Sequence, residues 1–218
     1  MSDSTDDNLR RQPSQDRSTQ RVTLILDTTA ALVDEVGLSG LTPALIARRS
    51  DMSGPAIYRY FADLDAIVRA LATRNLERFL DRTADLLADS ELTWEDAIAS
   101  SVDNYAHMYR TEPSFKSIRL GSGAGSLMNE GVSNKRVVAQ ATIAHFAPRY
   151  EAWDRPSMPL RVEAMIEIIE AFVARAFEPD GEDNEAFFLG EAKRLGVNYL
   201  AEILETVPGT PPAEHRVG

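Results

Sequence analysis

The sequence predicts an all-α protein in which a small N-terminal three-helix domain, containing a helix-turn-helix, precedes a larger helical domain. Two observations lead to this prediction. Apolar residues recur at helical spacing along most of the chain. Between Thr42 and Phe61, two short helices with their own capping residues are separated by a tight turn. At 218 residues, the chain is long enough to bury a substantial core.

Composition and charge limit the environment and the partners of the chain. Cysteine is absent, which excludes disulfides and thiolate metal sites. We find neither a signal peptide nor a long apolar span, so we expect a soluble cytoplasmic protein without membrane contact. The net charge is −11, yet residues 8–62 contain seven arginines against five acidic residues. A mildly basic N-terminal part followed by an acidic remainder is typical of a protein that contacts nucleic acid at one end only.

The first 36 residues contain a polar tail and the first predicted helix. Residues 1–17 are low in apolar content, and we expect them to be disordered. This tail contains three arginines, Arg10, Arg11 and Arg17, which could contact the phosphate backbone or the minor groove of DNA. We favour the alternative, in which the tail is solvated and the arginines have no role. Apolar residues at helical spacing predict a helix over 18–36, and Gly37 provides its stop.

The next two helices are short and locally capped. Thr42 suits the N-cap of a helix over 43–49, with Pro43 at its first position and Ala47 small enough for a second helix to cross closely. In the turn, Asp51 stands where a left-handed backbone is expected. Ser53 then caps a helix over 54–60, which is too short to persist without packing of its apolar side chains on its neighbours.

The outer face of this second helix has the composition of a DNA-reading surface. Small residues at its start allow a close backbone approach, while Tyr58 and Arg59 offer a hydroxyl and a guanidinium to phosphates or base edges. We therefore expect residues 18–62 to form a DNA-binding domain whose helix-turn-helix enters the major groove. The alternative is a pair of short helices that serve only as part of an all-α core.

This stretch resembles the TetR family of bacterial transcription regulators. The shared points are Thr42, the Ile46-Ala47 pair, Ser53 and the run Ile57-Tyr58-Arg59-Tyr60-Phe61, and the resemblance extends over about residues 22–71. Asp51 departs from the usual glycine of the family, and Leu64 replaces a lysine that commonly touches a phosphate. The predicted DNA-binding residues are Thr42, Pro43, Ser53, Gly54, Pro55, Ala56, Tyr58, Arg59 and Tyr60.

Residues 63–206 are predicted to form the larger helical domain. Asp63 suits the N-cap of a helix that, if it continues to Ala88, spans about 39 Å and can act as a lever. Thr93 opens a capping box for a helix that Pro113 ends, and a short amphipathic segment follows over 114–120. The glycine-rich stretch 121–126 lacks a nucleotide-binding pattern and is expected to be a loop. Further helices are predicted over 134–150, 157–177 and 183–206, with a disordered end over 207–218.

The helices over 157–177 and 183–206 have such wide apolar faces that we expect them to form a homodimer interface of four helices. An interior pair within a monomer is the alternative. The residues assigned to the interface are Phe188, Ala192, Leu195, Gly196, Tyr199, Leu200 and Ile203.

No catalytic constellation is found, and we expect neither an enzyme nor a cofactor. The three histidines are far apart in sequence and lack ligand spacing, so no metal site is predicted. Glu163, Glu167 and Glu170 lie at helical intervals, and we interpret them as a solvated face rather than a cation site. His145 is either a core histidine or a polar group in a cavity.

The family resemblance implies an effector cavity in the larger helical domain, residues 63–206. It also implies that a bound ligand shifts the helix that begins after Asp63. The candidate lining consists of the aromatic, methionine and histidine residues Trp94, Tyr105, Met108, Tyr109, Phe115, Met128, His145, Met165 and Phe172. Because few charges occur among them, we expect a moderately apolar effector. The predicted function is a ligand-responsive repressor that binds a palindromic operator as a dimer. An activator of the same fold, or a helical ligand-binding or enzymatic bundle without DNA binding, is the alternative.

Overall fold

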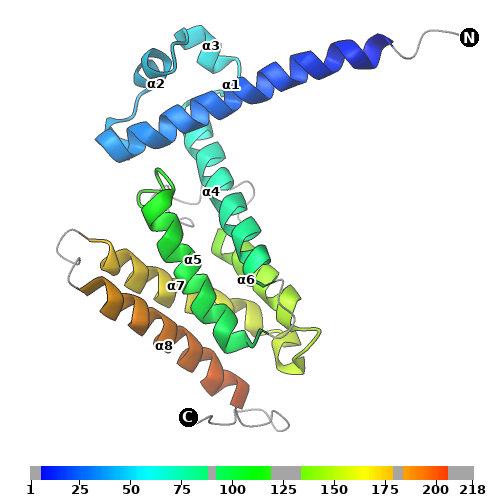
Figure 1. The fold of residues 1–218 in the computed structure, drawn as a ribbon, viewed down its shortest axis with the longest axis vertical. Coiled ribbons are helices and arrows are strands. Elements are labelled where there is room, and N and C mark those ends of the chain that lie inside the picture. Colours follow the sequence, from blue (N-terminus) through cyan, green and yellow to red (C-terminus); the bar gives the residue numbers. More distant parts are fainter. Residues whose placement is uncertain (1–5, 88–91, 119–133, 179–183, 206–218) are drawn as a thin grey trace, which may run out of the picture. The chain divides into compact units, whose positions relative to one another are not determined.

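The computed structural model describes residues 6–87, 92–118, 134–178 and 184–205, and these ranges contain helices and turns but no strand (Figure 1). The described chain forms two compact units. The first comprises the described residues up to Asn75 together with those from Pro113 to Ile118, and the second comprises the remaining described residues.

The first unit contains α1 (Asp6–Val36), a 3-10 turn η1 (Leu38–Gly40), α2 (Pro43–Arg49), α3 (Gly54–Tyr58) and the beginning of α4 (Leu64–Leu86). In Figure 1, α2 and α3 lie beside the C-terminal part of α1. The helix α1 ends at Val36, and Gly37 follows with a φ of 71°. The prediction of a disordered tail over 1–17 was wrong from Asp6 onward, because a polar stretch can continue a helix without any apolar period that would signal it.

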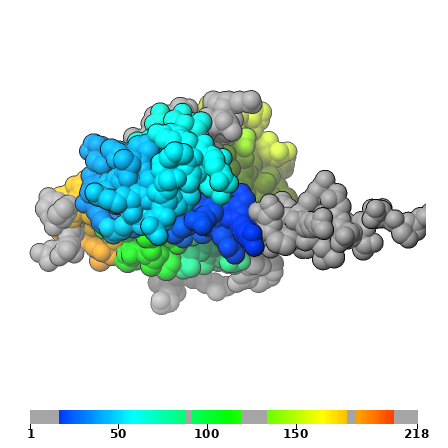
Figure 2. Space-filling view, turned by 90° about the horizontal axis from the view of Figure 1, so that it is seen from above, coloured from blue at the N-terminus to red at the C-terminus, as the bar shows by residue number. Residues whose placement is uncertain are grey.

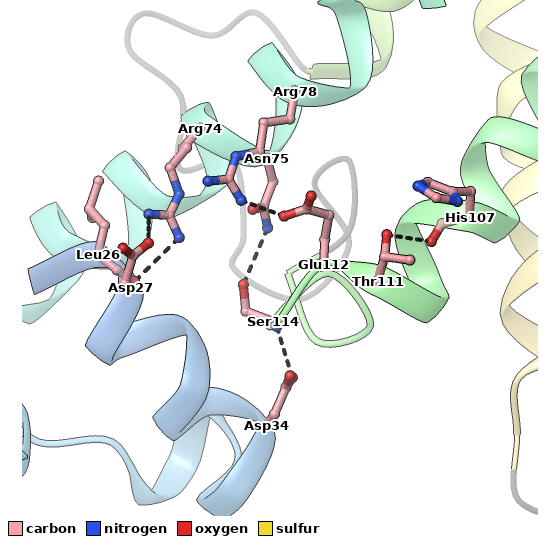
Figure 3. Close-up of polar contacts among 10 residues, drawn as sticks. All are labelled: Leu26, Asp27, Asp34, Arg74, Asn75, Arg78, His107, Thr111, Glu112 and Ser114. Atoms are coloured by element: carbon pink, nitrogen blue, oxygen red, sulfur yellow. Dashed lines mark hydrogen bonds and ion pairs between the residues drawn. The ribbon is translucent and has the colours of Figure 1, made fainter. Parts of the chain in front are cut away.

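One continuous core holds the first unit together. It is built from aliphatic side chains of α1, α2, α3 and α4, and its fully covered members include Ile25, Ile46, Ile57 and Leu71. Arg74 on α4 adds a polar tie to α1, because its guanidinium donates to the Asp27 carboxylate at 2.6 Å and to the backbone carbonyl of Leu26 at 3.4 Å (Figure 3). The short helices α2 and α3 therefore rest on a core that they could not form alone.

The segment from Pro113 to Ile118 belongs to the first unit, although it follows α5 in sequence. Figure 3 shows Ser114 between two side chains of this unit. The Ser114 amide donates to the Asp34 carboxylate at 2.8 Å, and the Asn75 side-chain amide donates to the Ser114 hydroxyl at 3.3 Å. Ser114 is fully buried with a φ of 71°, and Ile118 joins the aliphatic core.

This division differs from the predicted domain boundary between residues 62 and 63, which stays a prediction. The helix α4 begins in the first unit and continues into the second after Asn75. It has 23 residues, which corresponds to about 35 Å, and the Asp63 carboxylate caps it by accepting from the amide of Ala66 at 2.6 Å. A single helix thus connects the two units, as the lever hypothesis requires. The predicted amphipathic segment over 114–120 consists of turns as far as Ile118, and residues 119 and 120 lie outside the described residues.

The second unit contains the remainder of α4 with α5 (Trp94–Thr111), α6 (Asn134–Phe146), a 3-10 turn η3 (Glu151–Asp154), α7 (Met158–Ala176) and α8 (Glu185–Glu205). Thr93 caps α5 as predicted, because its hydroxyl accepts from the amide of Asp96 at 3.1 Å. The helix α7 packs most extensively on α8 and also on α5 and α6 (Figure 1). The predicted helix over 134–150 was too long, because α6 ends at Phe146. None of the described helices is long and apolar enough to cross a membrane.

The helix α8 uses its smallest residues to pack inside its own protomer. Ala192 and Leu200 have no exposed surface, and Gly196 is buried. A Cβ at Gly196 would lie 3.0 Å from Ile169 Cδ1 and 3.2 Å from Ile98 Cγ2, so the glycine permits a close approach of helices. The assignment of these three residues to a partner interface was therefore wrong. The other four assigned residues, Phe188, Leu195, Tyr199 and Ile203, are half-buried.

Candidate nucleic-acid interface

The helix α2 is anchored by its cap and by two inward side chains. The Thr42 hydroxyl accepts from the amide of Leu45 at 3.2 Å, and Pro43 occupies the first turn. Ile46 and Ala47 are buried in the core of the first unit. The first backbone N–H groups of a helix have no carbonyl partner within it, and the Thr42 hydroxyl accepts from one of them. This bond fixes the direction in which the seven-residue helix leaves the loop.

The turn between α2 and α3 has the left-handed residue that the sequence predicts. Asp51 has a φ of 52°, a conformation that aspartate tolerates better than most residues with a side chain. The turn is closed from both sides, because the Ser50 hydroxyl donates to the Ile46 carbonyl at 2.8 Å and the amide of Met52 donates to the Ala47 carbonyl at 2.9 Å. These bonds hold the turn against the end of α2.

The helix α3 presents an outward face over a single buried anchor. The Ser53 hydroxyl accepts from the amide of Ala56 at 3.3 Å, and Ile57 is buried. The α-helix ends at Tyr58 rather than at Tyr60, since the chain turns as the amides of Tyr60 and Phe61 donate to the Ile57 carbonyl. Its anchor Ile57 faces the core, so the neighbouring residues of the helix face solvent.

The predicted DNA-binding residues belong to the first unit, whose residues 17–75 Figure 2 draws in blue to cyan. Tyr58 is 54% exposed, and Arg59 is exposed with its guanidinium 5.7 Å from the centre of the Tyr60 ring. A Cβ at Gly54 would meet nothing within 4 Å, so the start of α3 offers an open backbone. The exposed or half-exposed members of the set are Thr42, Pro43, Ser53, Gly54, Pro55, Ala56, Tyr58, Arg59 and Tyr60.

Two further residues define the edges of this surface. Arg49 at the end of α2 is exposed and pairs with Glu35 on α1. Leu64 is half-buried and packs against the core of the unit, so its side chain offers no charge to a phosphate. The groups that this surface offers to DNA are hydroxyls, amides at the helix starts and the guanidinium of Arg59.

The residues predicted to line an effector site do not form one group. Trp94 packs near Trp153, with ring centres 6.5 Å apart, and Phe172 is half-exposed and packs near Phe188 at 6.2 Å. Phe115 is fully buried and belongs to the first unit, and its assignment to the effector site stays a prediction. Met128 lies outside the described residues. Those that remain buried in the second unit are Tyr105, Met108, Tyr109 and Met165.

His145 is half-buried beside a guanidinium rather than enclosed in the core. Its Nε2 lies 2.7 Å from Arg149 Nη2, and its ring meets Phe146 edge-on at 4.8 Å. Burial lowers the pKa of the His145 imidazole below its ordinary value, and the positive charge of Arg149 lowers that pKa further. The imidazole is therefore held neutral at physiological pH.

A buried polar cluster on three helices of the second unit was not predicted as such. Glu170 on α7 is 3% exposed, and its carboxylate accepts from the Tyr105 hydroxyl on α5 at 2.7 Å. Lys135 on α6 is 7% exposed, and its Nζ lies 2.5 Å from carboxylate oxygens of both Glu170 and Glu167. The interpretation of Glu163, Glu167 and Glu170 as one solvated face was thus wrong at Glu170.

The ammonium of Lys135 remains charged despite its burial. Desolvation lowers the pKa of this group and is the largest single influence, but hydrogen bonds and attraction to Glu167 and Glu170 raise it, and the net effect is a raised pKa. Glu163 is held by Arg136 at 3.3 Å. Within the described ranges, no group of three or more histidine or acidic side chains could hold a metal ion.

Comparisons with known proteins agree with this division of the chain. The sequence model of the bacterial regulatory proteins of the tetR family matches residues 25–71, and that of the tetracyclin repressor-like C-terminal domain matches residues 92–204. Over 66 residues the chain is 29% identical to YobS of Bacillus subtilis (strain 168), an uncharacterized HTH-type transcriptional regulator. That match covers 30% of this chain and only 35% of the relative.

Solved structures share the fold over most of the chain. A TetR-family transcriptional regulator from Streptomyces coelicolor superposes with a TM-score of 0.66 at 28% identity, covering 84% of this chain and 99% of that one. The transcriptional regulator FadR from Bacillus subtilis, solved in complex with stearoyl-CoA, has a TM-score of 0.59 at 13% identity. It covers 85% of this chain and 99% of its own, and at this identity the likeness shows the fold alone.

The family models together cover both the capped helix-turn-helix and the helical body. Proteins of this family regulate transcription by binding DNA, and their C-terminal domain binds ligands. The chain belongs to the TetR family of bacterial transcriptional regulators.

Proposed function

We propose that the chain is a ligand-responsive repressor that binds a palindromic operator as a homodimer and is released by a small, moderately apolar effector. The observation that carries the proposal is the outward face of α3, where Tyr58 and Arg59 project from a short, doubly capped helix pair. A guanidinium and a hydroxyl on such a helix suit phosphates and base edges in the major groove.

Dimerisation is proposed through α7 and α8. Leu160 on α7 and Phe187 on α8 are both large apolar residues with more than half of their surface exposed. The half-buried side chains Phe188, Leu195, Tyr199 and Ile203 lie on the surface of α8, whereas Ala192, Gly196 and Leu200 fill the protomer's own core. An apolar helix surface of this kind supports an isologous contact between two copies, which would present two α3 helices to two half-sites.

Selection of bound duplexes from a random DNA pool tests DNA recognition. We expect an inverted repeat whose half-sites are separated by about one helical turn, roughly 34–36 Å. Arg59→Ala should recover the repeat with weaker enrichment and, if the guanidinium contacts a base, with one position of each half-site relaxed. Arg82→Ala, which changes an exposed arginine of the second unit, should recover the same repeat as the wild type. Enrichment by the Arg59 variant that equals the wild type in both strength and sequence would remove Arg59 from the reading surface.

The repressor assignment adds a linkage between effector and operator. A ligand that releases the protein must bind the free form more tightly than the operator-bound form, with a coupling of about 1–3 kcal/mol. DNA must then weaken effector binding by the same factor. A ligand that binds the free protein and the operator complex equally well is not the effector, and a ligand that tightens operator binding would make the protein an effector-dependent binder instead.

A further inference from the structure

The part of α1 from Arg17 to Arg21 lies outside the core of the first unit. All five of these residues are helical and exposed, and the next residue, Val22, is half-buried against the aliphatic core. A helix segment that is polar on every side has no apolar stripe with which to pack. The side chains of Arg17 and Arg21 therefore do not hold the unit together.

The helix fixes these two arginines on one face of α1. They are four residues apart, a spacing that makes side chains neighbours on a helix surface. Two like charges at this spacing destabilise a helix. Neither guanidinium has an ion pair or a hydrogen bond among the described residues. The pair is therefore unfavourable in the free protein, and a bound anion would remove the repulsion.

Other arginines of the first unit have acidic partners. The pairs are Arg49 with Glu35, Arg69 with Asp63 at 3.7 Å, and Arg74 with Asp27 at 2.6 Å. Among the described side chains of this unit, four exposed arginines have no ion pair: Arg17, Arg21, Arg48 and Arg59. An exposed guanidinium without a carboxylate partner is free to bind a phosphate without breaking an existing ion pair.

The arginine pair of α1 shares its unit with α3. The face drawn in Figure 2 shows both the start of the described side chains of α1, in dark blue, and the residues around α3, in cyan. Val22, next to Arg21, packs on the same core as Tyr60, next to Arg59. Affinity for duplex DNA comes largely from cations that contact phosphates, yet Arg59 is the one cation among the predicted DNA-binding residues. Further cations of this unit would add affinity.

We propose, on the basis of the proposed function, that Arg17 and Arg21 form a second DNA contact, which binds backbone phosphates beside the half-site that α3 reads. This contact is independent of sequence, because phosphates carry no base information. It adds affinity, while α3 supplies specificity. The phosphates also neutralise the two like charges, so this part of α1 is more stable in the complex than in the free protein.

Fluorescence anisotropy titrations with two labelled duplexes, at several salt concentrations, test the inference. One duplex is the selected operator, and the other contains the same bases in scrambled order. We expect the double variant Arg17→Ala with Arg21→Ala to bind both duplexes about tenfold or more weakly, with a salt slope shallower by about two. Both positions are exposed and alanine favours helices, so this variant should remain folded.

Two control variants separate a phosphate contact from a general effect of charge. Arg17→Lys with Arg21→Lys keeps both charges and should keep the salt slope. Arg82→Glu changes the net charge by the same two units at an exposed residue of the second unit, and it should leave both affinities unchanged.

Three results would overturn the inference: an unchanged salt slope in the alanine variant, a loss confined to the operator duplex, or an equal loss in Arg82→Glu. These results are separate from failure of the proposed function. If an operator is selected and the alanine variant binds it as the wild type does, the function stands without the α1 contact. If no operator is selected but the scrambled duplex binds through both arginines, the α1 contact stands alone. Binding of neither duplex by the wild type would remove both.

Discussion

Two glycines show how differently the two units are built. A side chain at Gly54, at the start of α3, would enter open space, whereas a side chain at Gly196 in α8 would meet Ile98 and Ile169. In the first unit, functional residues project outward from a core made by other residues. In the second unit, most apolar residues of α5 and α7, together with Ala192, Leu200 and Leu204 of α8, are the core itself. Substitutions should therefore separate function from stability in the first unit and join them in the second.

The largest expected effect is on stability and lies in the second unit. Leu200→Ala removes a fully buried side chain, so the free energy of unfolding should fall by about 2–5 kcal/mol. Ile203→Ala, one turn away and half-buried, should lower it by less, at about 1–2 kcal/mol. Denaturant unfolding of both variants at one protein concentration measures the difference. Equal losses at the two positions would contradict the burial of Leu200 and the partial exposure of Ile203.

A smaller effect is expected on DNA affinity, with no loss of stability. Arg59→Ala should weaken operator binding by about 1–3 kcal/mol, because the guanidinium packs little and reaches a phosphate or a base. Titrations at several salt concentrations distinguish the two contacts. A phosphate contact lowers the salt slope by about one, and a base contact relaxes one operator position. An unchanged affinity at all salt concentrations would show that Arg59 does not touch DNA.

The turn between α2 and α3 should respond in the opposite direction. Asp51 adopts a left-handed backbone, so Asp51→Gly removes a steric penalty and should raise the free energy of unfolding by about 1 kcal/mol or less. Asp51→Val should lower it, because a β-branched residue tolerates a positive φ poorly. Thermal unfolding of the two variants checks the sign. A stabilised valine variant would be incompatible with this conformation.

The smallest effect concerns pH. The pKa of His145 is lowered in the folded state, so the unfolded state binds the proton more readily. The contribution of His145 to stability is then present above the ordinary imidazole pKa and is lost as pH falls through the lowered, folded-state pKa. His145→Gln should reduce the fall in the melting temperature between about pH 7.5 and about pH 5.5. An unchanged pH dependence would show that His145 titrates equally in both states.

How much could be predicted from the sequence also differs between the two units. The helix-turn-helix can be predicted from short stretches of sequence. Thr42 and Ser53 are N-caps that predict where their helices begin, and Asp51 predicts the position of the turn. In the body, the spacing of Glu170 with Glu163 and Glu167 favours a solvated face, and only the packing of α5 and α6 on α7 buries it. Phe115 follows α5 in sequence but belongs to the first unit, an arrangement that depends on long-range contacts.

The dimer assignment failed in part for the same reason. Ala192, Gly196 and Leu200 recur every four residues, which predicts one face of α8 but does not say whether that face meets the same chain or a second copy. The close approach of Gly196 to Ile98 and Ile169 decides the matter for this face. The partly exposed residues beside it remain the predicted interface.

We expect two copies of the chain, joined through α7 and α8, to place two α3 helices on one operator. Sedimentation of the protein with the selected operator duplex, at concentrations well above the dissociation constant, measures the mass of the complex directly. We expect two protomers on each palindromic duplex, and for Ile203→Glu a folded protein that occupies a half-site as a single protomer with much lower affinity. A single wild-type protomer on each palindromic duplex would contradict the proposed dimer.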